Sequence, residues 1–126
     1  MAIPQPQRQS SALVVDDHAA ARWVFAQALS ALGYTNVLAA SSRLTALSHC
    51  EAQPFDVVLV DLSLGGEDGL ELIDELRLSV GVGRIIALSA DAHRLQAAAS
   101  RADALLAKPL DPIAFVRVVG RPRPSS

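Results

Sequence analysis

Side chains able to do chemistry stand at the ends of several apolar runs in this chain. They are Asp16, Asp17, Asp61, Ser89 and Lys108, and the runs that they close lie at 13–15, 57–60, 85–88 and 105–107. In an open parallel sheet the carboxyl ends of the strands gather along one edge, and ligands bind in the crevice there. The spacing therefore predicts that the five side chains meet in one crevice.

The chemistry of such a crevice follows from its charges. Three carboxylates held together repel one another and raise their own pKa values unless a cation joins them. A small site with only oxygen ligands suits Mg²⁺, which keeps several waters and accepts phosphate oxygens as further ligands. Lys108 supplies a fixed cation and Ser89 a hydroxyl donor for the same phosphate. These residue types predict a phosphoryl-transfer site.

The elements that position these residues can be predicted from the hydrophobic pattern. Continuous apolar runs, typical of strands covered on both faces, lie at 12–15, 36–40, 57–61, 84–89 and 104–107. They alternate with helical patterns, which favours an α/β fold with a parallel sheet and five helices.

The first helix is expected to bury a stripe at i, i+3, i+4 and i+7 spacing and to stop at Gly33. The second is expected at about 42–50, the third after Gly69, the fourth at about 92–101, and the fifth with Asp111 as its N-cap. The apolar residues expected on the inner faces are Ala21, Val24, Phe25, Ala28, Leu29, Leu32, Leu44, Leu47, Leu72, Ile73, Leu76, Ile113, Phe115, Val116 and Val119.

Composition restricts the class of protein. With 126 residues, 51% of them hydrophobic, the chain is expected to form one domain at 11–120 between flexible tails at 1–10 and 121–126. With a net charge of -2, the chain lacks the excess of basic residues that is typical of proteins that bind nucleic acid directly. The lone Cys50 excludes an internal disulfide, and no apolar run approaches the roughly 20 residues that a membrane span needs. We expect a soluble, cytoplasmic protein without membrane insertion.

Taken together, these motifs closely resemble the response-regulator receiver domains of bacterial two-component signalling. The resemblance covers about residues 11–119, and it rests on the Asp16-Asp17 pair, Asp61, Ser89-Ala90 and Lys108-Pro109, in the family's order and spacing. The stretch from Asp61 to Ile73 also resembles the family's loop and third helix. The resemblance implies a three-layer, doubly wound α/β fold, in which the five-stranded parallel sheet has the flavodoxin-like strand order 2-1-3-4-5.

The resemblance also implies a role for each site residue. Asp61 would accept a phosphoryl group from a histidine kinase or a histidine phosphotransfer protein, which makes the chain a signalling phosphoacceptor rather than an enzyme. Asp17, Asp61 and the carbonyl of Ser63 would bind Mg²⁺ (or Mn²⁺) directly, and Asp16 through water. Lys108, the Ser89 hydroxyl and the Ala90 backbone N–H would hold the phosphate. A downstream effector, or a fused domain outside this chain, would read the change.

Several positions depart from the family pattern, and others are expected to affect the phosphoryl lifetime or partner binding. Leu105 stands where the family usually has an aromatic residue that rotates on activation, and Gly65 replaces a usual proline. Ser89 and Lys108 are closer in sequence than expected, which predicts a shortened fourth helix or flank. Ser63 and Asp91 are expected to tune the phosphoryl lifetime. Trp23, which lies off the buried stripe of its helix, is expected on a partner surface.

Three other functions remain possible from the residues. A phosphohydrolase of haloacid-dehalogenase type also uses an aspartyl nucleophile, but it needs an acid two residues later, where this chain has Ser63. A flavodoxin-like FMN carrier needs a phosphate loop at the position of Asp16-Asp17. A receiver-like module could act without phosphorylation. The three histidines, His18, His49 and His93, lack metal-ligand spacing and are interpreted as surface or loop residues.

Overall fold

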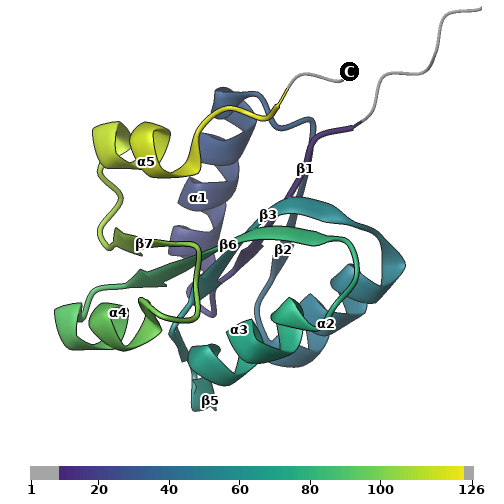
Figure 1. Ribbon diagram of the computed structural model, residues 1–126. Helices are drawn as coiled ribbons and strands as arrows, with labels where there is room; N and C mark the ends of the chain where they lie inside the picture. The colour runs from purple at the N-terminus through teal and green to yellow at the C-terminus, as the bar shows by residue number, and fades with distance from the viewer. Residues whose placement is uncertain (1–8, 124–126) are drawn as a thin grey trace, which may run out of the picture.

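The computed structural model describes residues 9–123 and has a five-stranded parallel sheet at its centre (Figure 1). The sheet order is β2-β1-β3-β6-β7. Its strands are β1 (Ser11–Val15), β2 (Asn36–Ala40), β3 (Phe55–Asp61), β6 (Val82–Ser89) and β7 (Ala104–Ala107). Counted among themselves, these strands follow the order 2-1-3-4-5, so the predicted flavodoxin-like topology is confirmed.

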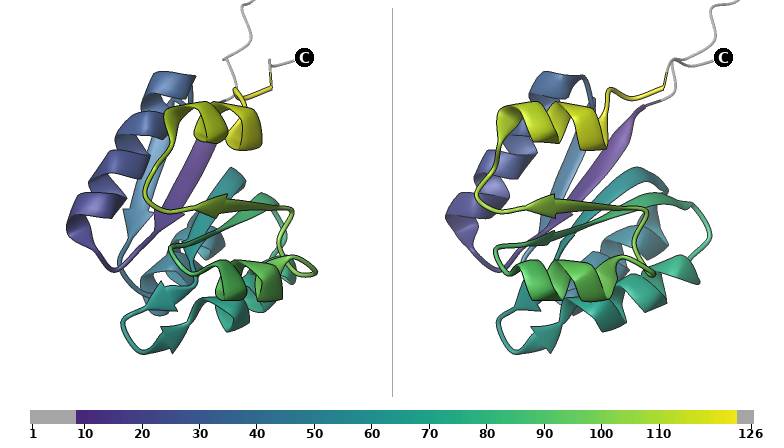
Figure 2. Two further views of the ribbon diagram at one scale, coloured as in Figure 1. Left: turned by 90° about the vertical axis from the view of Figure 1, so that its left-hand side faces the viewer. Right: turned by 60° about the vertical axis from the view of Figure 1, so that its left-hand side comes forward.

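Five helices cover the two faces of this sheet, which makes three layers (Figures 1 and 2). The helices α1 (Ala19–Leu32) and α5 (Pro112–Val119) lie on one face. The helices α2 (Arg43–Ala52), α3 (Gly69–Arg77) and α4 (Ala92–Ala98) lie on the other. The number of helices and the double winding are therefore as predicted.

The middle parts of the strands are apolar because their side chains alternate between two hydrophobic cores. On β1, Leu13 and Val15 pack toward α2, α3 and α4, whereas Ala12 and Val14 pack toward α1 and α5. Each buried leucine or valine contributes about 1.5–3 kcal/mol relative to an exposed one. The two cores hold the sheet between the helices and so fix its carboxyl edge.

Local signals set the helix ends. Asp68, Asp91 and Asp111 each accept a backbone N–H from the first turn of the helix that follows. This satisfies donors that have no partner within the helix. Gly33 ends α1 with a φ of 118°, a conformation that favours glycine.

Some of the inner-face predictions are wrong. Val24, Leu44, Ile113 and Val116 are exposed. In α2 the buried residues are Ala46 and Cys50, and Leu44 precedes Ala46 by two positions, which places it on the opposite side of the helix. The fourth helix also ends at Ala98, three residues before the predicted end.

A two-stranded antiparallel hairpin between β3 and α3 was not predicted. It consists of β4 (Ser63–Leu64) and β5 (Glu67–Asp68), joined by Gly65 and Gly66 with φ values of 52° and 98°. Two successive positive φ angles are the requirement of the tight type I′ hairpin turn. Proline cannot adopt a positive φ, which explains why glycine fits at position 65.

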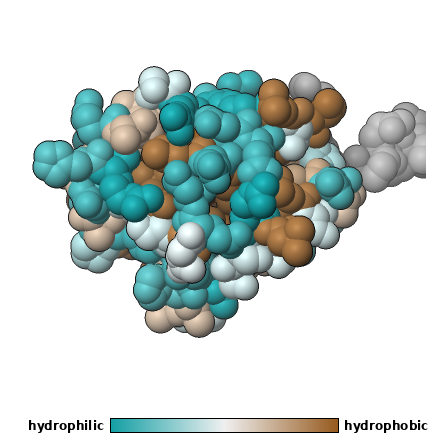
Figure 3. All heavy atoms as spheres, turned by 90° about the horizontal axis from the view of Figure 1, so that it is seen from below, coloured by the Kyte–Doolittle hydropathy of each residue, from teal (hydrophilic) through white to brown (hydrophobic). Residues whose placement is uncertain are grey.

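The surface seen from below is mostly hydrophilic, and its apolar residues form separate patches (Figure 3). Of the predicted flexible tails, residues 1–8 and 124–126 lie outside the described residues. Within residues 9–123, none of the helices is long and apolar enough to cross a membrane.

Candidate functional site

Asp16 follows the last residue of β1 and is fully buried. Its Oδ2 accepts a hydrogen bond from Lys108 Nζ at 2.8 Å, and its Oδ1 accepts one from the backbone N–H of His18 at 2.9 Å. A buried carboxylate is tolerated only when it is paired and hydrogen-bonded. Lys108 and the turn into α1 meet this need for Asp16.

Asp61 is the last residue of β3 and is 3% exposed. Its Oδ1 accepts the backbone N–H of Ser63 at 2.9 Å, and its Oδ2 accepts Lys108 Nζ at 3.2 Å. Burial raises the pKa of Asp61, and the negative charge of Asp16 adds to this, against the opposing effects of the Ser63 N–H and Lys108. The carboxylate is thus held beside a cation in a partly desolvated place.

Lys108 follows β7 and joins the two carboxylates. Burial would lower the pKa of Lys108, but the hydrogen bond to Asp16 and the charges of Asp16 and Asp61 outweigh it, so the pKa is raised. The Lys108 backbone N–H also donates to the Ser89 carbonyl at 2.9 Å, which ties it to the end of β6. The ammonium group is therefore a fixed positive charge in the crevice.

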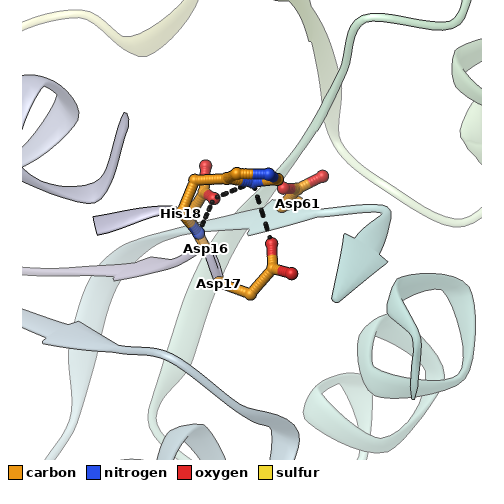
Figure 4. A group of neighbouring side chains, drawn as sticks. All are labelled: Asp16, Asp17, His18 and Asp61. Carbon is orange, nitrogen blue, oxygen red and sulfur yellow. Dashed lines mark hydrogen bonds and ion pairs between the residues drawn. The ribbon is translucent and has the colours of Figure 1, made fainter. Parts of the chain in front are cut away.

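Asp17 and His18 complete the acidic side of the crevice (Figure 4). The Asp17 Oδ1 atom is buried and accepts no hydrogen bond from any residue in the described range. His18 Nδ1 lies 3.0 Å from Asp17 Oδ1 and 3.5 Å from Asp16 Oδ1. Oxygen or nitrogen atoms of Asp16, Asp17, His18 and Asp61 lie within 4.8 Å of one another.

This set of donors fits a divalent cation. Three carboxylates contribute hard oxygen ligands, and the Asp17 Oδ1 atom lacks the hydrogen bond that a buried oxygen normally has. The hairpin closes this side, since a Cβ atom built on Gly65 would lie 2.9 Å from Asp17 Oδ2. The predicted acidic cluster is thus assembled by the fold.

Ser89 ends β6 and is 3% exposed. Its Oγ accepts the backbone N–H of Asp91 at 3.0 Å, so the intervening Ala90 lies in a tight turn at the edge of the crevice. The Asp91 carboxylate accepts the backbone N–H groups of His93 and Arg94 and caps α4. Asp91 therefore has a structural role that the sequence analysis did not assign.

The other predicted residues lie outside the acidic cluster. Leu105, on β7, is partly buried against the core formed with α2, α3 and α4. Trp23, on α1, is 65% exposed, which agrees with its predicted position off the buried stripe. Ser63 is exposed on β4, and its backbone N–H contacts Asp61.

Sequence reasoning missed three residues at the site. His18 is an exposed residue of the loop between β1 and α1, as interpreted, but its imidazole also lies beside the two aspartates, and its position directly after them was the available signal. Arg22 Nη1 donates to the Asp16 carbonyl at 2.8 Å, and Arg94 Nη2 donates to the Leu62 carbonyl at 2.6 Å. Nothing in the sequence marked these arginines, because each contacts a backbone oxygen rather than a side chain of the motif.

A hollow of about 310 Å³ lies at the opposite edge of the sheet. Its lining includes Ser11, Asn36 and Phe55, the first residues of β1, β2 and β3. The carboxylates of Asp16 and Asp61 lie at the carboxyl ends of β1 and β3, so the hollow at the start of these strands is separate from the crevice.

The fold and the crevice together define a doubly wound α/β protein with an acidic cluster and a lysine at its carboxyl edge. The family model described as "Response regulator receiver domain" matches residues 12–119. The chain belongs to this family.

Curated relatives agree with this family. The chain is 31% identical over 106 residues to the transcriptional regulatory protein YvrH of Bacillus subtilis, and the match covers 82% of this chain and 45% of YvrH. It is 33% identical over 110 residues to the nitrate/nitrite response regulator protein NarL of Escherichia coli, covering 84% of this chain and 51% of NarL. The chain thus spans about half the length of these relatives.

Solved structures show the same fold. A CheY-like receiver domain from Methylobacillus flagellatus has a TM-score of 0.78 and 29% identity, with 86% of this chain and 93% of that chain covered. A response regulator from Burkholderia pseudomallei, solved with a phosphorylated aspartic acid, calcium ion and citrate, has a TM-score of 0.75 and 31% identity. That match covers 86% of this chain and 65% of that chain.

Proposed function

We propose that this chain is a phosphoacceptor of two-component signalling that receives a phosphoryl group on Asp61. The observation that carries the proposal is the placement of Asp61, which lies beside Lys108 and the Asp16-Asp17 pair at the carboxyl edge of the sheet. The phosphoryl donor would be the phosphohistidine of a histidine kinase or of a histidine phosphotransfer protein.

In the proposed transfer, a carboxylate oxygen of Asp61 attacks phosphorus while the phosphorus–nitrogen bond to the donor histidine breaks. The electron pair of that bond returns to the leaving imidazole, and an acyl phosphate forms. The Ser63 N–H holds Asp61 Oδ1, and Lys108 lies 3.2 Å from Oδ2. The ammonium group of Lys108 stabilises negative charge that develops on the phosphoryl oxygens.

Asp17, Asp61 and the Ser63 carbonyl would hold Mg²⁺ (or Mn²⁺), with Asp16 acting through water. When bound, the cation neutralises charge on the phosphoryl oxygens. The buried Asp17 Oδ1 without a hydrogen bond supports this assignment. The structure of the Burkholderia relative, which contains a phosphorylated aspartic acid and a calcium ion, also supports it.

The phosphorylated state would be recognised by Ser89 and Ala90. The Ser89 hydroxyl and the Ala90 backbone N–H would donate to the phosphoryl group, and this pull on the β6–α4 turn would start the conformational switch. Leu105 cannot make the swing of an aromatic ring. We infer that the readout in this chain depends on the β6–α4 turn, which Asp91 links to the capped end of α4.

The test is labelling with a small phosphodonor and Mg²⁺, followed by intact mass measurement. Wild type is expected to gain one phosphoryl group, Asp61→Asn none, and a chelator is expected to abolish the gain. Asp74→Asn, which changes an exposed aspartate on α3, is the matched control and should label normally. Undiminished labelling of Asp61→Asn would overturn the proposal.

The alternatives are separated by the same experiment. A haloacid-dehalogenase-type phosphohydrolase would hydrolyse many molecules of the phosphodonor. In this chain, however, the position of its second acid is occupied by the exposed Ser63. A phosphorylation-independent module would not label at all. Output by an effector, or by a domain fused to this one, is also part of the proposal, since the relatives are about twice as long as the match.

A further inference from the structure

We propose that His18 is an additional ligand of the metal site, so that the site binds transition metals such as Co²⁺ and Ni²⁺ through an imidazole nitrogen as well as through carboxylates. The proposal rests on the metal-binding part of the proposed function. It changes the expected metal preference of the site.

The first argument is geometric. With metal–ligand bonds of about 2.0–2.1 Å, adjacent ligands of an octahedral ion lie about 3.0 Å apart. His18 Nδ1 is 3.0 Å from Asp17 Oδ1 and 3.5 Å from Asp16 Oδ1. One ligand atom from each of Asp16, Asp17, His18 and Asp61 lies within 4.8 Å of the others, which is slightly more than the about 4.2 Å that separates opposite ligands of such an ion.

The second argument concerns the nature of the contact between His18 and Asp17. Although Nδ1 is 3.0 Å from Asp17 Oδ1, this oxygen accepts no hydrogen bond from the described residues. The dashed line between the ring and the Asp17 carboxylate in Figure 4 marks this contact, which has the distance of an ion pair but not the geometry of a hydrogen bond. A cation between two lone pairs would satisfy both groups.

The third argument is the position of His18 in the fold. His18 is the N-cap residue of α1, a position where serine, threonine, aspartate and asparagine are preferred. Its side chain makes no capping hydrogen bond. The backbone N–H of His18 instead donates to Asp16 Oδ1, which fixes the residue at the acidic cluster. Helix capping therefore does not account for this side chain.

Ligand chemistry then sets the expected preference. Imidazole nitrogen suits cobalt, nickel and zinc, whereas Mg²⁺ prefers carboxylate, carbonyl and water oxygens. Of the three histidines, His18 joins the cluster, while His49 on α2 and His93 on α4 do not. A second histidine of the same chain is therefore available as a control.

The experiment uses the whole chain of 126 residues without a tag and isothermal titration calorimetry with NiCl₂, CoCl₂ and MgCl₂. His18→Ser replaces the imidazole with a good N-cap, so the helix start is preserved. This variant is expected to lose about tenfold or more in Ni²⁺ and Co²⁺ affinity, the scale of losses seen when the surroundings of a metal are altered. Its Mg²⁺ affinity is expected to change by less than about twofold, because oxygen ligands dominate for that ion.

His93→Ala and Asp17→Asn complete the design. His93→Ala is expected to bind Ni²⁺ as wild type does, and Asp17→Asn is expected to lower the affinity for all three metal ions. Unchanged Ni²⁺ affinity in His18→Ser, or an equal loss in His93→Ala, would overturn the role of His18. If Asp17→Asn leaves Mg²⁺ binding intact, the metal site of the proposed function fails instead, and the two failures are therefore distinguishable.

Discussion

At the scale of single residues, Lys108 is the link between the two buried carboxylates. Its Nζ atom donates to Asp16 at 2.8 Å and to Asp61 at 3.2 Å, and its own pKa is raised by them. The lysine thus compensates negative charge in the resting site and would meet a third anion when a phosphoryl group arrives. Its contribution should therefore appear in both stability and response.

We predict that Lys108→Ala keeps the fold but loses the spectral change that follows phosphorylation. Without the ammonium group, the phosphate has no fixed cationic partner on the chain. Free energy of unfolding should fall by roughly 1–3 kcal/mol in a chelator, because buried Asp16 loses its strongest donor. Arg117→Ala, an exposed cation on α5, is the control. A full spectral response in Lys108→Ala would contradict the assignment.

The raised pKa of Asp61 predicts how stability depends on pH. Because the folded pKa lies above the ordinary value of 3.8, the protonated carboxyl is favoured by the fold, and this contribution is lost as the pH rises through the folded pKa. Asp61→Asn does not titrate at this position. In a chelator, its stability advantage over wild type should grow from acidic to neutral pH and then level off. Urea unfolding across pH measures this, and a constant difference would refute it.

At the scale of elements, the approach of α3 to β3 depends on Gly69. A Cβ atom built at this position would lie only 2.4 Å from the Asp61 carbonyl oxygen and 2.6 Å from Leu62 Cα. Both contacts involve backbone, so neither can be relieved by turning a side chain. The start of α3 therefore lies directly against the strand end that carries Asp61.

Gly69→Ala is predicted to lower the free energy of unfolding by about 1–3 kcal/mol, the usual cost of overpacking. The backbone shift should also slow labelling of Asp61 by a small phosphodonor. Glu71→Ala, at an exposed position two residues later in α3, serves as the control. Chemical denaturation and labelling rates measure the two effects. Wild-type values for both in Gly69→Ala would show that the approach is not tight.

Asp91 and Ser63 are predicted to tune the phosphoryl lifetime, because they lie two residues beyond Ser89 and Asp61. Asp91→Ala also removes the N-cap of α4, at about 1 kcal/mol of stability. Asp91→Ser retains a capping oxygen, so it separates the loss of charge from the loss of the cap. The decay of labelled protein is the measurement. Wild-type decay in Asp91→Ser and in Ser63→Ala would refute the tuning role.

At the scale of the whole molecule, the exposed apolar residues are distributed over several elements. Trp23 on α1 is 65% exposed and Leu44 on α2 is 75% exposed. The face seen from below shows separate apolar patches (Figure 3). Tryptophan is enriched among the residues that dominate binding at protein interfaces.

Trp23→Ala is predicted to slow transfer from the cognate phosphohistidine partner about tenfold or more, on the scale of a hot-spot truncation, while labelling by a small phosphodonor stays near wild type. Stability should change by less than about 1 kcal/mol, since the ring is mostly exposed. Leu44→Ala is the matched exposed control. Equal slowing of both reactions, or a large loss of stability, would show that Trp23 contributes to packing rather than to partner binding.

The sequence by itself determined the sheet and the residues that meet at its carboxyl edge. Apolar runs show where strands end, and a parallel sheet places those ends along one edge, so Asp16, Asp61 and Lys108 could be predicted to meet. The motif order then identified the family that the comparison confirmed. These features depend on local pattern and on topology.

Other features were decided only by the tertiary structure. The rotation of a helix about its axis depends on what packs against it, so Leu44 and Ile113 are exposed although they are apolar. The Gly65-Gly66 hairpin forms against Asp17, and His18 turns toward the carboxylates instead of capping α1. Such contacts join side chains through space, and their geometry follows from the packed cores rather than from spacing along the chain.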